Sequence, residues 1–287
     1  MTTLSPEEDA AAGSCDPTQP FLGLRFAMAD CERVLRELRK RAAELRFFFI
    51  VTPNTDHIVK LDRLGSTKLG LDLREAYGSA DLCLCDSQVL AKLARISGLR
   101  LPVITGSDLT RLLFERSVIG KGSRVALVGG TAGQLEWLRG RWPEVAFFAH
   151  FPPMDVLQDM SAQSAIIAFV EEMQCDFTFF AFGAPQSELI AWHVARRGCA
   201  RGVGLCVGAS IEFLTGAKRR APRWMQRLSL EWAYRLVSEP RRLGRRYLID
   251  GPRILPIWWR SRTSAPASGI VVPPRPSPFE PRRGDEG

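Results

Sequence analysis

Residues 124–141 read RVALVGGTAGQLEWLRGR, and this stretch decides the fold class. It starts with an apolar run, continues through two glycines and ends in a segment with helical spacing. Similar short apolar runs, each bounded by Gly, Pro or Asp, occur at residues 47–52, 82–85, 146–149, 177–182 and 202–207. Together with residues 124–128, these runs predict six strands.

Helix-like segments separate these runs, and one precedes them. They are residues 30–45, 87–97, 108–119, 132–141, 161–174 and 187–197. Continuous apolar strands that alternate with helices are typical of a parallel sheet covered on both faces. The sequence therefore predicts a three-layer, Rossmann-like α/β domain.

Ligands of such domains bind in the crevice outside the carboxyl ends of the strands. The residues that follow the predicted strands are therefore the most informative ones. Four turns stand out at these places, namely residues 52–54, Asp86, residues 129–131 and residues 183–185. We expect them to converge at one edge of the sheet.

The chain has 287 residues, of which 46% are hydrophobic, so it can bury one substantial core. We expect four regions: a disordered tail at 1–20, a Rossmann-like domain at 21–216, a basic appendage at 217–261 and a disordered tail rich in Pro and Arg at 262–287. The first region has acids where a signal peptide needs a basic start, and no stretch approaches the roughly 18 apolar residues of a membrane span. These features predict a cytoplasmic protein that is soluble or lies on a membrane surface.

The seven cysteines are odd in number and scattered, which favours reduced core thiols over disulfides or a metal site. The chain contains no HExxH, no CxxC and no Asp-x-Asp motif. Catalysis by a protein-held metal is therefore disfavoured. The three histidines occur singly, so surface or hydrogen-bonded core roles are expected for His57 and His193.

The positive charge of the chain is concentrated in one segment. Residues 218–260 carry twelve Lys and Arg and three Asp and Glu, which gives this segment a net charge of +9. The whole chain has a net charge of +8, so all other residues together sum to −1. Within this segment an apolar stripe follows helical spacing beside a face of arginines: Met225, Leu228, Trp232 and Leu236. Arginines with Trp258 and Trp259 are typical of a membrane-surface element. A helix packed on the domain, or arginines that hold ligand phosphates, remain alternatives.

Asp86 follows an apolar run and precedes a helical segment. Its carboxylate has two compatible interpretations, a helix N-cap and a general base that accepts a proton from a hydroxyl. Two glycine-rich turns also have two interpretations each. Gly129 and Gly130, like Gly208 with Ser210, either serve tight turns and close packing or bring backbone N–H groups to a phosphate or sugar.

Six blocks of sequence, read together, resemble the WecG/TagA/CpsF glycosyltransferases, known as glycosyltransferase family 26. They are VTPNTDHIVKL (51–61), ADLCLCDSQVLAKLARISG (80–98), TGSDLTRLL (105–113), VALVGGTAG (125–133), FFAFGAPQSELI (179–190) and VGASIEFLTGAKRRAPRWMQRLSLEWAYRLVSEPRRLGRRYL (207–248). The resemblance implies inverting, metal-independent transfer of a sugar from a UDP-sugar to a polyprenyl-diphosphate-linked acceptor, with no cofactor. It also implies a C-terminal appendage that touches the membrane and helps to close the active site.

The resemblance also implies roles for individual residues. Asp86 falls on the proposed catalytic base, and Thr52 and Asn54 fall on an active-site threonine and asparagine. The substrate-binding candidates are Asp108, Gly129, Gly130, Gly183, Pro185, Gln186, Ser187, Glu188, Gly208, Ser210, Arg219, Arg220, Arg223 and Arg227. Ser187 stands where the family has an active-site glutamine, and whether it or Gln186 takes over that role is open.

Two other functions remain alternatives. A nicotinamide-dependent oxidoreductase would use the turn at 129–133, although the GGxxG spacing departs from the dinucleotide fingerprint. A nucleic-acid-binding protein would use the arginine segment on phosphates, but that function leaves the crevice unexplained, so no nucleic-acid partner is expected. The donor sugar, the acceptor glycan and a homo-oligomeric state are not readable from the residues.

Overall fold

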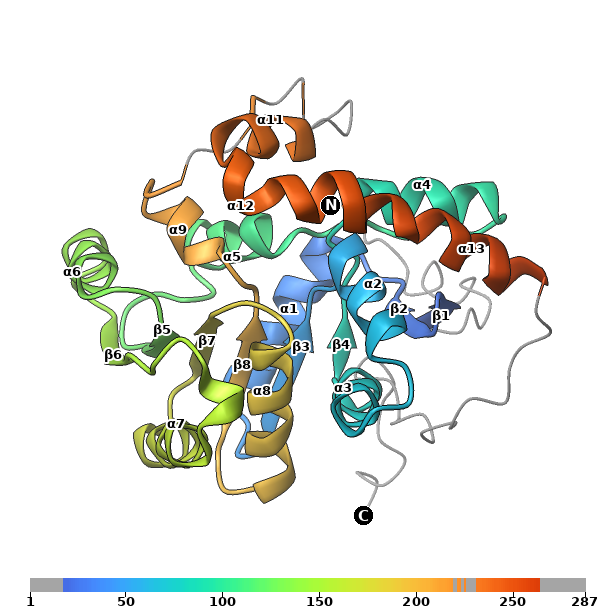
Figure 1. Cartoon of the computed structure of the whole chain (residues 1–287). Helices are drawn as coiled ribbons and strands as arrows, with labels where there is room; N and C mark the ends of the chain where they lie inside the picture. Colours follow the sequence, from blue (N-terminus) through green and yellow to red (C-terminus); the bar gives the residue numbers. More distant parts are fainter. Residues whose placement is uncertain (1–17, 219–220, 223–224, 226–230, 264–287) are drawn as a thin grey trace, which may run out of the picture.

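The computed structural model describes residues 18–218, 221–222, 225 and 231–263 (Figure 1). Six strands form one sheet in the order β4-β3-β8-β7-β5-β6, and every neighbouring pair is parallel. The strands are β3 (Phe47–Val51), β4 (Leu82–Cys83), β5 (Arg124–Gly129), β6 (Ala146–His150), β7 (Phe177–Ala181) and β8 (Gly202–Cys206). The predicted α/β fold class is confirmed, and each strand lies within a residue or two of its expected position.

Helices cover both faces of this sheet (Figure 1). They are α1 (Cys31–Ala42), α2 (Thr55–Leu64), α3 (Lys68–Ser79), α4 (Gln88–Ile96), α5 (Gly106–Glu115), α6 (Ala132–Arg141), α7 (Met160–Met173), α8 (Gln186–Arg197) and the short α9 (Ser210–Leu214). Successive side chains of a strand point to opposite faces. Accordingly, Phe47 and Phe49 belong to the core that includes side chains of α3, α7 and α8, whereas Phe48 and Ile50 belong to the core that includes side chains of α1, α5 and α6. The result is the expected three-layer arrangement.

Besides α2 and the short α9, which none of the predicted segments covers, two further elements of the structure were not predicted. An antiparallel hairpin, β1 (Thr18–Phe21) and β2 (Leu24–Ala27), begins inside the region expected to be a tail. Its turn places Leu22 and Gly23 at positive φ, and its apolar residues join the two cores. Helix α3 is the second element. It presents Leu73, Ala76 and Tyr77 to the core beside α8.

The C-terminal segment is a series of short helices where one amphipathic helix was expected. They are α11 (Glu231–Ser238), α12 (Pro240–Gly244), the π-helical η3 (Arg245–Asp250), η4 (Gly251–Arg253) and α13 (Ile254–Thr263). Proline fixes its own φ and lacks an N–H donor, so Pro240 starts α12 and ends the preceding helix. Figure 1 shows α12 and α13 running across the end of the domain at which α2 and α5 begin.

Helix α13 packs against the Rossmann-like domain. Ile254 is buried, Trp258 lies against the core, and the indole N–H of Trp258 donates to Ser97 Oγ at 2.9 Å. Two ion pairs join α2 to this part of the chain, Arg63 with Asp250 of η3 at 3.3 Å and Asp62 with Arg260 of α13 at 2.9 Å. The alternative in which part of this segment packs on the domain is therefore correct for α13.

Within the described residues, no helix has the length and apolar character that crossing a bilayer requires. The six cysteines in this part of the chain are free thiols, and four of them are buried: Cys83, Cys85, Cys175 and Cys206. The prediction of reduced core thiols is confirmed for these four. Cys15 lies outside the described residues.

Candidate active site

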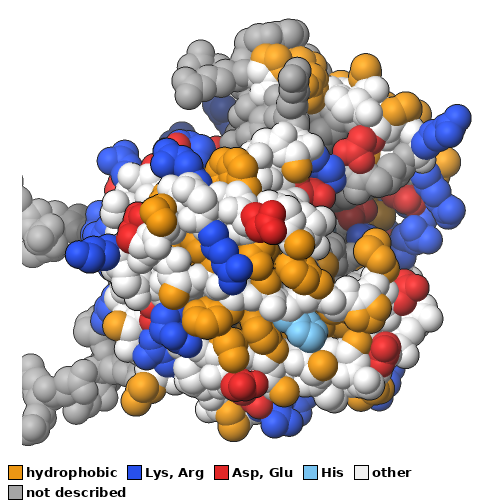
Figure 2. Space-filling model, turned by 90° about the vertical axis from the view of Figure 1, so that its left-hand side faces the viewer, with side chains coloured by type: hydrophobic (Ala, Val, Ile, Leu, Met, Phe, Trp, Pro, Cys, Tyr) orange, Lys and Arg blue, Asp and Glu red, His pale blue; other side chains and the backbone are white. Residues whose placement is uncertain are grey.

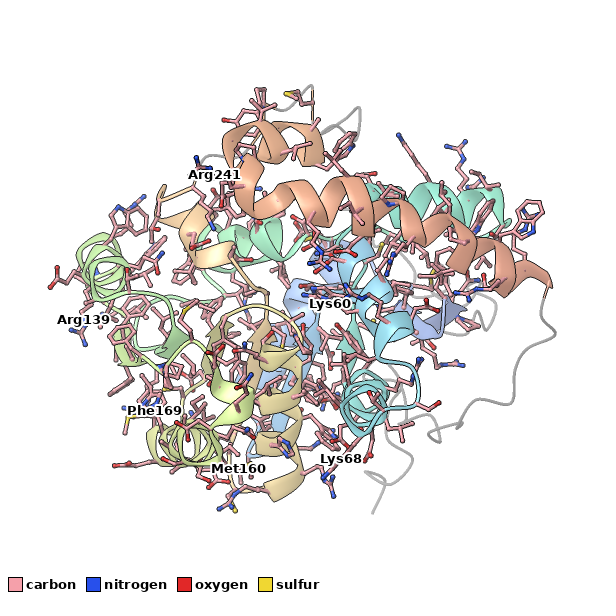
Figure 3. The ribbon with its side chains drawn as sticks, viewed as in Figure 1. Lys60, Lys68, Arg139, Met160, Phe169 and Arg241 are labelled. Carbon is pink, nitrogen blue, oxygen red and sulfur yellow. The ribbon has the colours of Figure 1, made fainter. Side chains whose placement is uncertain are left out.

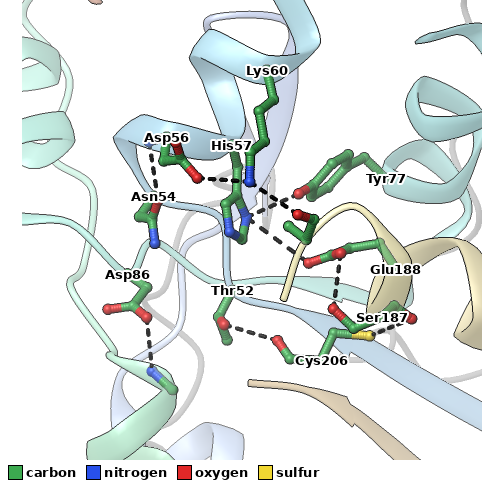
Figure 4. Close-up of polar contacts among 12 residues, drawn as sticks. Thr52, Asn54, Asp56, His57, Lys60, Tyr77, Asp86, Ser187, Glu188 and Cys206 are labelled. Atoms are coloured by element: carbon green, nitrogen blue, oxygen red, sulfur yellow. Dashed lines mark hydrogen bonds and ion pairs between the residues drawn. The ribbon is translucent and has the colours of Figure 1, made fainter. Parts of the chain in front are cut away.

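Thr52 and Asn54 follow the carboxyl end of β3. Thr52 is 3% exposed, and its hydroxyl donates to the carbonyl oxygen of Cys206 at 2.9 Å, so it joins the ends of β3 and β8. Asn54 is the N-cap of α2, where its side-chain oxygen accepts from the backbone N–H of Asp56 at 3.0 Å. An N-cap of this kind satisfies a donor that the helix itself leaves free. Figure 4 shows both side chains beside Asp86.

Asp86 lies at the N-terminus of a helix that is not its own. The N-cap of α4 is Ser87, whose Oγ accepts from the N–H of Leu90 at 3.2 Å. The Asp86 carboxylate instead accepts from the N–H of Gly106, the first residue of α5, at 3.3 Å. The capping interpretation is therefore wrong for α4. The N-terminus of α5, with its partial positive charge, stabilises the carboxylate.

The first turn of α5 is packed closely against the neighbouring turns. A Cβ atom at Gly106 would lie 3.1 Å from Ser210 Oγ and 3.2 Å from Thr52 Oγ1, so the absence of a side chain permits this approach. Ser210 is buried at the start of α9. The structure thus gathers Thr52, Asp86 and Ser210 around one helix N-terminus.

Asp108 belongs to the same helical turn. Its carboxylate accepts from the hydroxyl of the N-cap Thr105 at 2.7 Å, and its N–H donates to the same hydroxyl at 3.0 Å. The Nη2 atom of Arg111 lies 3.8 Å from Oδ1 of the Asp108 carboxylate. The structure gives Asp108 a capping role at α5, which keeps this helix start in place beside Asp86.

The glycine turn after β5 lies farther along the same edge. Gly129 and Gly130 have φ of 88° and 77°, a region that side chains disfavour, so the turn itself requires glycine. The N-cap Thr131 and Gln134 form a capping box, in which Gln134 Oε1 accepts the Thr131 N–H at 3.0 Å. Gly208, after β8, also has a positive φ of 54°.

The loop between β7 and α8 contains a cis peptide bond between Ala184 and Pro185. Gly183 is exposed, Pro185 is partly exposed, and Gln186 uses its side-chain amide on the carbonyl oxygen of Met154 at 3.3 Å. From the opposite side, Lys60 of α2 donates to the Ala184 carbonyl oxygen at 2.9 Å. The loop is thus in contact with α2 across the edge of the sheet (Figure 4).

Ser187 and Glu188 point into the protein, and each is 1% exposed. The Ser187 hydroxyl donates to Glu188 Oε2 at 2.9 Å. Glu188 Oε1 lies 3.9 Å from His57 Nδ1, which is 3.0 Å from the hydroxyl of Tyr77. Desolvation by burial raises the pKa of Glu188 from 4.5 to about 7, and the Ser187 hydrogen bond and Lys60 oppose that rise.

This buried network was not foreseen. The expectation of a hydrogen-bonded role for His57 is confirmed by its contact with Tyr77. Of the two residues considered for the family's glutamine position, Gln186 is the partly exposed one and Ser187 is enclosed. Arg219, Arg220, Arg223 and Arg227 lie outside the described residues. Within the described part of the chain, no group of three or more His, Cys, Asp and Glu side chains has the arrangement of a metal site.

Comparison with known proteins gives a consistent result. The model of the glycosyl transferase WecG/TagA/CpsF family matches residues 19–268. Two similar proteins, from Staphylococcus aureus strains MRSA252 and MW2, are both named N-acetylglucosaminyldiphosphoundecaprenol N-acetyl-beta-D-mannosaminyltransferase. The first is 31% identical over 109 residues, 38% of this chain and 40% of that protein. The second is 32% identical over 127 residues, 42% of this chain and 47% of that protein. Each match spans less than half of the relative's length.

Proposed function

Because the chain belongs to the WecG/TagA/CpsF family of glycosyl transferases, we propose that it transfers a sugar from a UDP-sugar to a polyprenyl-diphosphate-linked acceptor. The two staphylococcal relatives are named for an acceptor of this kind, an N-acetylglucosaminyl group on diphosphoundecaprenol. Such a reaction belongs to the synthesis of cell-surface polysaccharides. The observation that carries the proposal is the position of Asp86 at the N-terminus of α5, beside Thr52 and Asn54.

In the proposed reaction, Asp86 is the general base. Its carboxylate accepts the proton of the acceptor hydroxyl, whose oxygen forms a bond to the anomeric carbon of the donor. The bond from that carbon to the diphosphate oxygen breaks, and UDP leaves with the electron pair from the opposite face. This geometry inverts the anomeric configuration. Thr52 and Asn54, held by the ends of β3 and β8 and by the start of α2, border the reacting groups.

Negative charge builds up on the diphosphate as UDP leaves, and donors that are already in place stabilise it best. In our proposal these donors are backbone N–H groups near Gly129 and Gly130, together with Arg219, Arg220, Arg223 and Arg227 of the appendage. Gly183, Pro185, Gln186, Gly208 and Ser210 border the sugar. No protein-held metal takes part in this scheme.

A panel of UDP-sugars with a lipid-linked N-acetylglucosamine diphosphate, analysed by mass spectrometry, tests the function. We expect a product whose mass exceeds that of the acceptor by one sugar residue, in the presence of EDTA as well as in its absence. A thermal-shift screen with UDP, NAD and RNA distinguishes the alternatives, since a ligand stabilises the protein that binds it. Stabilisation by NAD or RNA alone would overturn the proposal.

We also propose that the C-terminal segment contacts an anionic membrane surface. Several apolar side chains are exposed there among arginines, namely Leu248, Ile249, Leu255 and Trp259. Leu255 and Trp259 lie four residues apart on α13, about one helical turn, so they share one face of that helix. Leu248 and Ile249 precede them in η3. An interfacial element of this composition would place the enzyme on the cytoplasmic side, where the lipid-linked acceptor is accessible.

A further inference from the structure

We propose that Lys60 and Glu188 are positioning residues that fasten the cis-proline loop, residues 183–185, to the first turns of α2. Together they form a clamp that sets the spacing between Asn54 and this loop across the crevice. The proposal rests on the proposed function for its catalytic consequence. Its structural part stands on the contacts alone (Figure 4).

The outer half of the clamp is Lys60. Its ammonium group donates to the Ala184 carbonyl oxygen at 2.9 Å and pairs with Asp56 Oδ2 at 2.9 Å. The backbone N–H of Asp56 in turn donates to Asn54 Oδ1 at 3.0 Å. One continuous path therefore leads from the cis-proline loop to Asn54. Figure 3 shows Lys60 at the end of the sheet below the C-terminal helices, and its side chain is 37% exposed.

The inner half of the clamp is Glu188. It is the third residue of α8, a helix whose N-cap, Pro185, provides no side-chain hydrogen bond. The carboxylate accepts from Ser187 and faces His57 of α2, which contacts Tyr77 of α3. Glu188 thereby joins the start of α8 to the starts of α2 and, through His57, to α3.

The inner half also reaches Thr52. The carbonyl oxygen of Ser187 accepts from the Cys206 thiol at 3.4 Å, and the carbonyl oxygen of Cys206 accepts from the Thr52 hydroxyl at 2.9 Å. Small displacements of α8 would therefore shift Thr52 and Asn54 together. Misplacement of reacting groups by about 1 Å can reduce a rate about 100-fold.

The two halves depend on each other electrostatically. A carboxylate in an apolar interior is costly unless a cation or a hydrogen bond compensates it. The titratable groups that face Glu188 are His57 and Lys60 of α2, Tyr77 of α3 and Cys206 of β8. Of these, Lys60 is the cation that lowers the pKa of Glu188. Loss of Lys60 would favour the protonated carboxyl.

Hydrogen–deuterium exchange of the full, ligand-free chain tests the clamp without any substrate. The variants are Lys60→Met and Glu188→Gln, with Lys68→Met as the control because Lys68 is exposed at the start of α3. We expect the N–H groups of Gln186, Leu189 and His57, which bond within the clamped turns, to exchange about 10-fold faster or more in both variants. The exchange rates of peptides from β5 and α6 should be the same in the variants as in wild type. Unchanged exchange at the clamped turns, or a uniform rise everywhere, overturns the proposal.

Transfer kinetics then separate positioning from packing. We expect kcat to fall about 10-fold or more in Lys60→Met with a smaller change in the donor KM, and Lys60→Arg to restore most of it because guanidinium also donates to a carbonyl. Lys68→Met should keep wild-type rates. Faster exchange with an unchanged kcat would make the clamp merely structural and overturn its catalytic role. Absence of transfer by the wild-type chain would instead count against the proposed function, while the exchange result still decides the clamp.

Discussion

Asp86 acquires its setting from two segments that are distant in sequence. Its backbone N–H donates to the carbonyl oxygen of Pro53 at 3.1 Å, while its carboxylate accepts from Gly106 at the start of α5. The first contact fixes the backbone beside β3, and the second orients the carboxylate toward a helix N-terminus that stabilises negative charge. In the proposed reaction, a base held in this way is oriented before the acceptor arrives.

Replacement of Asp86 by asparagine should therefore abolish proton acceptance while keeping the hydrogen bond to Gly106. We expect the transfer rate to fall by about 10²–10⁴-fold, because general base catalysis contributes on this scale. Loss of the negative charge at the start of α5 should lower the free energy of unfolding by at most about 1 kcal/mol, so the variant stays folded. The matched control is Glu172→Gln, because Glu172 is an exposed acidic residue at the C-terminal end of α7. Near-normal transfer by the folded Asp86→Asn variant would exclude Asp86 as the base.

Glu188 leads to a prediction about stability and pH. Its folded-state pKa, about 7, lies above the usual 4.5, so the folded state holds a proton that the unfolded state releases between these values. The stabilisation from this proton is complete below pH 4.5 and is lost as the pH rises through 7. Glu188→Gln stays neutral throughout. Its stability relative to wild type should therefore rise by about 3 kcal/mol from pH 4.5 to pH 8.

Urea unfolding of both proteins across this range measures the difference. His150 and His193, whose pKa values burial lowers, titrate in both proteins and cancel in the comparison. A difference that stays constant with pH would mean that Glu188 titrates at its ordinary value.

The candidate site could be predicted from sequence only in part. Their position after apolar runs drew attention to Asp86 and to the turn at residues 52–54, because in a parallel sheet that position leads to the crevice. The active-site roles of Asp86, Thr52 and Asn54 are implied by the family resemblance and stay predictions. The network around Glu188 was not found. Its partners His57 and Tyr77 lie on two other helices, and their distance from Glu188 in the sequence carries no periodic signal.

At the scale of elements, α13 connects the appendage to the domain. Replacement of Trp258 by phenylalanine removes the indole N–H that donates to Ser97 and keeps an aromatic ring against the core. We expect a loss of about 1 kcal/mol in the free energy of unfolding, the usual net value of one hydrogen bond. Denaturant unfolding measures it, with Trp259→Phe as the control because Trp259 is 63% exposed. Equal stability of Trp258→Phe and wild type would show that the hydrogen bond contributes nothing.

The elements themselves were predicted where a single pattern dominates. The six strands and α1 and α4 to α8 follow clear apolar runs or helical spacing. Helix α3 was missed because Gly70 and Gly78 weaken its helix propensity, whereas in the structure it packs against α8, α2 and β2. Charge and apolar periodicity continue past Pro240, and for this reason the sequence suggested one helix where the structure has α11 and α12.

At the scale of the whole molecule, the appendage contributes to the fold. Leu243 and Ile254 are buried, Ile254 and Trp258 lie against the core of the domain, and Lys218 pairs with Glu212 of α9 at 2.6 Å. A chain that ends at Gly216 would expose apolar surface that these residues cover. We expect it to unfold at a lower urea concentration than the full chain. Its free energy of unfolding should be lower by several kcal/mol, the scale expected for loss of buried side chains of this size. An unchanged midpoint would make the appendage an independent unit.

Membrane contact must accordingly be tested on the full chain, with substitutions that leave the packed side of α13 intact. Leu248, Leu255 and Trp259 are exposed, so their replacement by serine removes apolar contacts without opening the core. The net +9 of residues 218–260 should favour anionic lipid, at about 1 kcal/mol for each basic residue near the surface.

In vesicle flotation, the wild-type chain should bind phosphatidylglycerol vesicles and not phosphatidylcholine vesicles. Binding should weaken as salt rises, because the Debye length shortens from about 10 Å at 0.1 M to about 3 Å at 1 M. The triple serine variant should lose most of the binding, whereas Trp258→Phe, altered on the packed side, should keep it. If the wild-type chain bound neutral vesicles as well as anionic ones, or if the triple variant bound anionic vesicles as well as wild type, the exposed apolar residues and their neighbouring arginines would not be the lipid contact.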